Sequence, residues 1–198
     1  TRGFNYKDMA ILARSNMALR LIEHNLNVAS IPYKVFGGIK FFERDEVKTL
    51  MCYLRVIMNE KDTLAFERVI QNPKRGVGLK TLQELKQFTN PFLGIDKIKI
   101  SKKAYQNLKE LETDIARWRL ELPQEKNMTF FILRLMEESG LKDYYNEEKR
   151  INNLKQLAEL ASNFKQLSDL VNSFFNLEDE NQQQDEISLM TFHMAKGL

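Results

Sequence analysis

The sequence has few of the residues that build metal centres or covalent cross-links. Its 198 residues include one cysteine, Cys52, and two histidines. A structural zinc site takes about four Cys and His ligands, so such a site is excluded, and one cysteine cannot form an internal disulfide. No apolar run approaches the ~18 to 20 residues that span a bilayer, and the N-terminus lacks a basic segment followed by an apolar stretch. We therefore expect a cytoplasmic protein that contacts no membrane.

The charge of the chain is small and unevenly distributed. The formal net charge is +3, which gives weak overall electrostatic steering. Basic residues gather at 34–48, 74–75, 97–103 and 149–150, whereas residues 178–186 carry acids and no base. The 43% of hydrophobic residues is enough for a sizeable core, and the acidic, Gln-rich stretch is typical of a solvated linker.

Both ends of the chain have the pattern of an α/β fold. A near-continuous apolar run over residues 8–14 predicts a buried parallel strand, and Ser15 and Asn16 supply caps for a following helix. Residues 31–36 predict a second strand and residues 187–191 a third. Because three strands are too few for a parallel sheet covered on both faces, we expect the chain to be a piece of a larger protein.

The middle of the chain is helical in pattern. Apolar residues recur at helical spacing over 43–59, 64–70 (a helix that Pro73 ends) and 79–88. Three further stripes lie at 104–118, 130–136 and 154–167, and we interpret them as helix–helix core. Asn90-Pro91 and Gly94 mark a boundary before this second set.

Three widely separated stretches carry motifs. The first comprises residues 11–16, 31–33 and 37–48; the second is Asn-Pro-Lys-Arg-Gly-Val-Gly at 72–78; the third is Leu-Met-Thr-Phe-His-Met-Ala-Lys-Gly-Leu at 189–198. In order, they resemble motif IV with its continuation, the Pro-x-Arg-Gly-Ile-Gly turn, and motif V of the UvrD/Rep/PcrA-type superfamily 1 DNA helicases. The middle of the chain resembles this family more loosely.

This resemblance implies a fold and an activity. The fold is a partial RecA-like (P-loop NTPase-like) parallel sheet with a mostly α-helical inserted domain. Residues 1–93 and 184–198 would belong to the second motor domain (2A), and residues 94–183 would form the helical insertion (2B). The parent protein would be an ATP-dependent helicase with 3′ to 5′ polarity that unwinds DNA in replication or repair.

The resemblance also implies ligands and partners. ATP and Mg²⁺ would bind the full-length protein, and the DNA partners would be single strands and single-strand/duplex junctions. The chain has no Gly-x-x-x-x-Gly-Lys-Ser/Thr phosphate loop. That loop would lie in the missing first motor domain, so we expect the fragment alone to bind no cofactor and to be inactive as an ATPase.

Arg14 is the candidate catalytic residue. It ends an apolar strand, where a permanently charged guanidinium needs a partner at the strand's carboxyl edge. Such an arginine can stabilise charge on a transferred phosphoryl group, and the family's arginine reaches the γ-phosphate from this position. An ion pair with Glu23 is the structural alternative. The residue before Arg14 is Ala13, where the family usually has a Tyr that stacks on adenine.

The third stretch supplies candidate DNA contacts in the motor part. Thr191, His193 and Lys196 could hold backbone phosphates, as motif V does in the family, and Gly197 is a candidate nucleotide contact. For a single histidine, an ordinary core or surface role is the alternative.

Further DNA-binding candidates lie in the helical part. At 74–78 the glycines permit a phosphate to approach the backbone closely, and the neighbouring basic residues supply positive charge. We expect either a phosphate site or a plain turn there. Residues 139–142 resemble the hairpin by which the family's inserted domain touches duplex DNA, and a helix-ending glycine is the alternative. The candidate residues are Lys74, Arg75, Gly76, Gly78, Gly140 and Lys142. Phe41 and Phe42 could stack on a nucleotide or pack into the core.

Two other functions are compatible with these patterns. The chain could belong to the UvrD-like motor of a RecB- or AddA-type helicase-nuclease, or it could be a non-catalytic helical adaptor for nucleic acid or protein. A nuclease domain after residue 198 would identify the first, and the lack of a neighbouring phosphate loop would identify the second.

Overall fold

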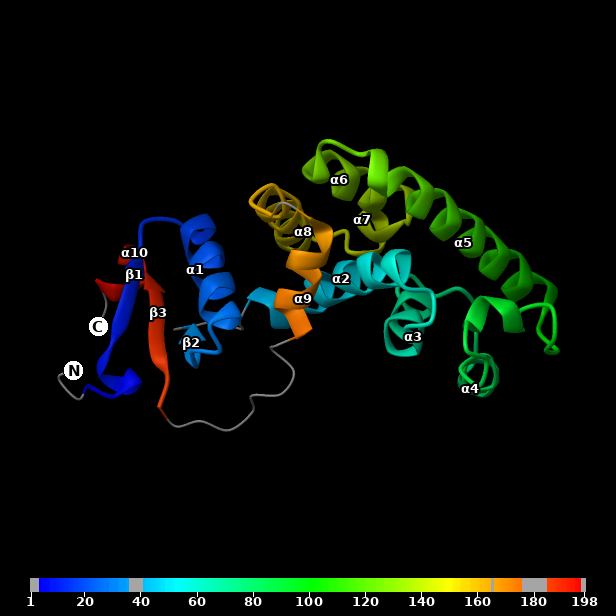
Figure 1. The fold of residues 1–198 in the computed structure, drawn as a ribbon, viewed down its shortest axis with the longest axis horizontal. Coiled ribbons are helices and arrows are strands. Elements are labelled where there is room, and N and C mark those ends of the chain that lie inside the picture. Colours follow the sequence, from blue (N-terminus) through cyan, green and yellow to red (C-terminus); the bar gives the residue numbers. More distant parts are fainter. Residues whose placement is uncertain (1–3, 36–40, 165, 176–184, 197–198) are drawn as a thin grey trace.

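The structure, a computed structural model, describes residues 4–35, 41–164, 166–175 and 185–196. It has two parts, which lie side by side along the long axis (Figure 1). One part is a small parallel sheet with a helix on one face. The other part is an assembly of helices, so the predicted α/β fold with a mostly helical section is confirmed.

The described strands form one parallel sheet in the order β1-β3-β2. The strands are β1 (Ala10–Ala13), β2 (Tyr33–Val35) and β3 (Ile187–Thr191). In the register, Leu189 of β3 lies opposite Ile11 on one side and Val35 on the other. The last strand of the chain is therefore the central one. Because all three strands are parallel, their carboxyl ends meet at one edge of the sheet.

Helix α1 (Asn16–Val28) covers one face of this sheet. It begins at Ser15, whose Oγ accepts a hydrogen bond from the amide of Ala18 at 3.2 Å. Leu19 and Leu26 bury their side chains against the sheet. On the opposite face of β1, Leu12 is 41% exposed. Among the described residues α1 covers only one face of β1, so the predicted burial of this strand is seen on that face alone.

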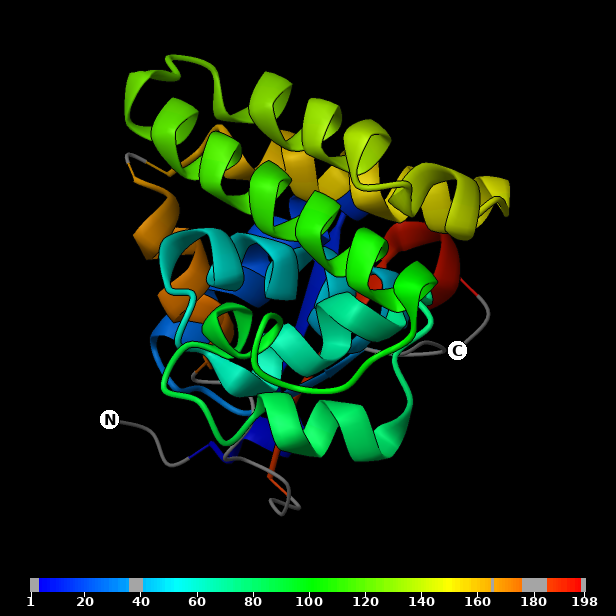
Figure 2. The same cartoon turned by 90° about the vertical axis from the view of Figure 1, so that its right-hand side faces the viewer.

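The helical part is built around α2, which is buried on nearly all sides. The helices α3, α5 and α8 pack around it, and α6 packs on α8. Seen end on, α5 crosses the helical part with α4 below it (Figure 2). The helices are α2 (Asp45–Met58), α3 (Thr63–Gln71), α4 (Leu79–Leu85), α5 (Lys102–Glu121), α6 (Met128–Glu138), α7 (Leu141–Tyr144), α8 (Glu148–Ala161) and α9 (Leu167–Phe175).

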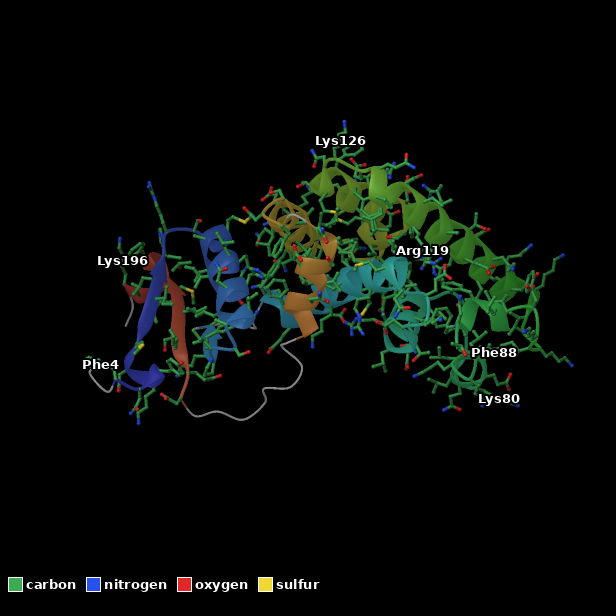
Figure 3. The ribbon with its side chains drawn as sticks, in the orientation of Figure 1. Phe4, Lys80, Phe88, Arg119, Lys126 and Lys196 are labelled. Carbon is green, nitrogen blue, oxygen red and sulfur yellow. The ribbon has the colours of Figure 1, made fainter. Side chains whose placement is uncertain are left out.

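Arg119 fixes α5 against the end of α2. Its guanidinium donates to the carbonyl oxygens of Ile57 at 2.7 Å and Val56 at 2.9 Å, which are among the last carbonyls of α2 (Figure 3). A helix has no internal partners for these groups, so the side chain satisfies them. Trp118, the preceding residue, is fully buried in the same core.

The spacing of the apolar stripe at 154–167 predicts one helix, but the structure has two. Helix α8 ends at Ala161, and α9 begins at Leu167. Ser162 Oγ donates to the carbonyl of Glu159 at 2.7 Å, and Asn163 Nδ2 donates to the carbonyl of Leu160 at 3.1 Å. These side chains compete with the helical hydrogen bonds and end the helix.

A buried polar network joins the two parts. Helix α1 packs against α8 and α9. On α1, Arg20 and Glu23 form a buried ion pair at 2.5 Å, and Glu23 also accepts a bond from the amide of Phe41 at 2.9 Å. The guanidinium of Arg20 lies 4.7 Å from the centroid of the Phe41 ring, and that of Arg44 lies 5.7 Å from it. Arg44 in turn donates to Asn153 of α8.

The hydrophobic core does not divide at residue 93. One buried cluster runs from Phe41 to Val171, so α2, α3 and α4 share it with the later helices. A smaller cluster joins α1 to the sheet. The assignment of residues 1–93 to a motor domain stays a prediction.

Candidate nucleotide and nucleic-acid interfaces

The predicted motor residues meet at the carboxyl edge of the sheet. Ala13 pairs with Thr191 in the parallel register, so Arg14 and the start of α10 (Phe192–Ala195) leave neighbouring strands at the same edge. Lys196 follows α10, and Figure 3 shows it at this end of the molecule. Gly197 lies outside the described residues. Residues 14 and 191–196, far apart in sequence, are therefore brought together.

Arg14 is exposed at this edge, and no ion pair of the described residues includes it. The alternative ion pair with Glu23 is not formed, because Glu23 is buried with Arg20. Glu23 also accepts a bond from the hydroxyl of Tyr33 at 3.4 Å. Burial is the main cause that raises the pKa of Tyr33, and the Glu23 carboxylate is the next. The Tyr33 hydroxyl therefore stays protonated and donates a hydrogen bond to Glu23. The guanidinium of Arg14 is thus free to meet a ligand.

The side chains on the β3 side of this edge are accessible. His193 and Lys196 are exposed, and the Thr191 hydroxyl makes no capping bond to α10. A guanidinium, an ammonium, an imidazole and a hydroxyl on one edge can bind phosphate oxygens without reading a base sequence.

The two predicted segments of the helical part also meet. Gly140 has φ of +78°, a left-handed conformation that favours glycine. A Cβ on Gly140 would lie 3.6 Å from Cγ of Pro73. Nearby, the Tyr144 hydroxyl donates to Oδ1 of Asn72 at 2.9 Å. The 72–78 turn and the 139–142 segment therefore form one surface, which we call the turn surface.

A recess of about 500 Å³ lies on the turn surface. Gly76, with φ of +76°, and Gly78 line it, together with Lys74 and the ring of Tyr144. None of the described lining residues is acidic. The recess thus offers backbone and cationic groups to an anion. The phosphate site at 74–78 stays a prediction.

The half-buried Arg75 lines the recess, but its guanidinium is bound to groups of the protein, although its sequence position predicts a phosphate contact. Its Nη2 donates to the hydroxyl of Tyr53 at 3.0 Å and approaches the carbonyl of Ser139 at 3.5 Å. Asn107 of α5 holds the Arg75 carbonyl at 3.1 Å. The guanidinium thus joins the turn to α2 and to the 139–142 segment.

Lys142 is exposed on α7, where Glu137 partly neutralises it. The hydrogen bond and charge of Glu137 raise the pKa of Lys142, so the side chain stays cationic. A DNA phosphate would compete with this carboxylate for the ammonium.

Two residues proposed as stacking partners are in the core. Phe41 is 0% and Phe42 2% exposed, so neither ring can reach a nucleotide, and their packing interpretation is confirmed.

Sequence reasoning missed Tyr144, whose place beside the turn depends on a long-range contact. Among the described residues no group of three His, Cys, Asp or Glu side chains could hold a metal ion. None of the described helices is long and apolar enough to cross a membrane.

Comparison with known proteins identifies the family. DNA helicase II of Escherichia coli K12 is 34% identical over 230 residues, which cover 96% of this chain and 30% of that protein. The ATP-dependent DNA helicase PcrA of Staphylococcus epidermidis RP62A is 29% identical, covering 99% of this chain and 30% of its own length. The chain thus spans about a third of the length of the curated relatives it matches. The family model of the UvrD-like helicase C-terminal domain matches residues 1–198, and the chain belongs to this family.

Proposed function

We propose that this chain is the 2A and 2B portion of an ATP-dependent DNA helicase that moves 3′ to 5′ along a single strand. The observation that carries the proposal is the group of Arg14, Thr191, His193 and Lys196 at one sheet edge, in a chain of the UvrD-like family. The names of the relatives, DNA helicase II and PcrA, support a motor over an adaptor.

Arg14 would contact the terminal phosphate of ATP held with Mg²⁺ by another motor domain of the same protein. Its exposed, unpaired guanidinium fits that role, because it can approach an anion without first breaking an internal ion pair. Gly197 would lie close to the same nucleotide. The bound ATP supplies the phosphoryl group, and Arg14 would stabilise the charge that builds on it.

The two surfaces would divide the DNA between them. Thr191, His193 and Lys196 would hold the backbone of the single strand. The turn surface, with Lys74, Gly76, Gly78, Gly140 and Lys142, would hold the duplex side of the junction. In both places phosphate contacts would position DNA of any sequence.

The proposal is tested in the longer protein that would contain this chain. Arg14→Ala should lower kcat for DNA-stimulated ATP hydrolysis by at least ~100-fold and weaken ATP binding much less, because the group acts mainly in the transition state. Steady-state kinetics and nucleotide titration measure the two effects. The 198-residue chain alone should not hydrolyse ATP.

The matched control is Arg150→Ala, since Arg150 is a partly exposed arginine of the helical part. It should leave both kinetic constants near wild type. Equal losses of turnover and of ATP binding in Arg14→Ala would contradict the transition-state role, and ATP turnover by the 198-residue chain would contradict the assignment to 2A and 2B.

A further inference from the structure

The N-terminal end of α5 lies against the turn surface. A Cβ on Gly76 would be 3.9 Å from Cβ of Ala104. One turn further along the helix, Asn107 Nδ2 donates to the carbonyl of Arg75 at 3.1 Å. Two separate contacts therefore fix this end of α5 to the chain beside the recess.

Lys103 is positioned by these contacts. Residues four apart lie on the same side of a helix, so Lys103 stands on the side of Asn107, one turn toward the N-terminus. Ala104 beside it touches the turn. Lys103 is exposed, and no ion pair of the described residues includes it.

The carboxylate of Asp96, which precedes α5, is engaged by two residues of that helix. Asp96 accepts hydrogen bonds from the Tyr105 hydroxyl at 2.8 Å and from Lys109 at 3.2 Å. Lys109 is further paired with Glu112 at 2.6 Å. Lys103 and Lys74 thus make no ion pair among the described residues, whereas Lys109 is paired with two carboxylates.

We propose that Lys103 is a phosphate contact for duplex DNA. It would extend the turn surface, to which Lys74 belongs, onto the N-terminal end of α5. The proposal rests on the proposed function of that surface. Lys74 lines the recess, which has no acidic residue among its described lining residues, and Lys103 stands on the adjacent end of α5. Two cations from separate segments fit a regular polyanion better than an isolated phosphate. The sequence separation of Lys74 and Lys103 explains why no motif connects them.

Binding of the 198-residue chain to a blunt DNA duplex of about 20 base pairs, from about 50 to 200 mM salt, tests this contact. Each phosphate contact contributes about −0.9 to the slope of log K against log salt. Lys103→Ala should therefore make the slope shallower by about 0.9 and weaken binding about tenfold at the lowest salt. Lys103→Arg should keep the slope.

Two lysines of the same region of sequence serve as controls. Lys109→Ala removes an ammonium that is already paired with the carboxylates of Asp96 and Glu112. Lys126→Ala removes an exposed lysine beyond the other end of α5, which is about 30 Å long (Figure 3). Both should leave the slope unchanged, and all variants should keep the wild-type thermal unfolding curve because these side chains are exposed or partly exposed.

The outcomes separate this inference from the proposed function. If the wild-type chain binds no duplex, the proposed function of the turn surface fails and this inference fails with it. If Lys74→Ala makes the slope of log K against log salt shallower and Lys103→Ala does not, only this inference is overturned. If Lys103→Ala weakens a single strand of equal length as much as the duplex, the duplex assignment is overturned.

Discussion

The guanidinium of Arg75 links two segments of the helical part. The side chain joins Tyr53 of α2 to the carbonyl of Ser139. Hydrogen bonds from a charged group contribute about 1.5 to 3 kcal/mol. Arg75→Ala should lower the free energy of unfolding by about that amount, and Arg75→Lys should not restore it, since a lysine lacks the planar fork.

Urea unfolding of the 198-residue chain measures the change, with Lys74→Ala as the control. Lys74 is exposed on the same turn, so its substitution should change stability by less than about 0.5 kcal/mol. If Arg75→Ala leaves stability unchanged and instead makes the salt slope of DNA binding shallower, then Arg75 is a phosphate ligand as its sequence position predicts.

The local predictions at this scale succeed where the responsible groups are neighbours in sequence. The Ser15 cap and the buried Phe41 and Phe42 follow from their own surroundings. The inward direction of Arg75 depends on Tyr53 and Ser139, which lie 22 and 64 residues away. No pattern around Arg75 contains that information.

Helix α1 carries a buried histidine, His24, whose protonation should destabilise the fold. His24 is buried edge-on against the ring of Phe164, with centroids 4.4 Å apart, and its Nδ1 has no partner among the described residues. Burial lowers the pKa of His24. The unfolded chain therefore binds more protons below pH ~6.5, so the stability present at neutral pH is lost as the pH falls through the unfolded pKa toward the folded one.

Urea unfolding between about pH 7 and pH 5 should show this loss, with a slope of up to about 1.4 kcal/mol per pH unit. His24→Leu should reduce the loss, because leucine fills much of the space and cannot be protonated. His193→Ala, which changes an exposed histidine, should retain it. An equal loss in wild type and His24→Leu would mean that other groups cause the acid sensitivity.

Elements are predicted well where a stripe or run has clear limits. The pattern predicts α2 and α3 to within about two residues, because charged residues and Pro73 mark their ends. The break between α8 and α9 was missed, since the stripe continues in phase across Ser162 and Asn163. The place of β3 between β1 and β2 was also hidden, because hydrophobic runs identify strands and not their order.

The molecule presents its two candidate DNA surfaces on different parts, one on the sheet and one on the helices. In the longer protein, Lys142→Ala should weaken binding to a hairpin with a single-stranded tail and leave binding to the tail alone near normal. His193→Ala should weaken binding to the tail. Fluorescence titrations with the two DNAs measure both effects.

The control for this pair is Lys126→Ala, an exposed lysine that precedes the start of α6, at the opposite end of that helix from Gly140, and it should change neither affinity. If Lys142→Ala and His193→Ala weaken both DNAs equally, the division between sheet and helices is wrong. Sequence reasoning could nominate both residues by motif resemblance. It could not place them, because the sheet edge and the turn surface are each made by segments that fold together from distant positions.

The central position of β3 has a consequence for biosynthesis. Among the described residues, β1 and β2 each pair only with β3, which begins at Ile187. About 150 residues are made between β2 and β3, which takes roughly 8 to 30 s at typical synthesis rates. Until then neither early strand has the partner that it pairs with among the described residues, whereas the helices encoded between them can already pack. A ribosome pause in this interval would delay the completion of this sheet.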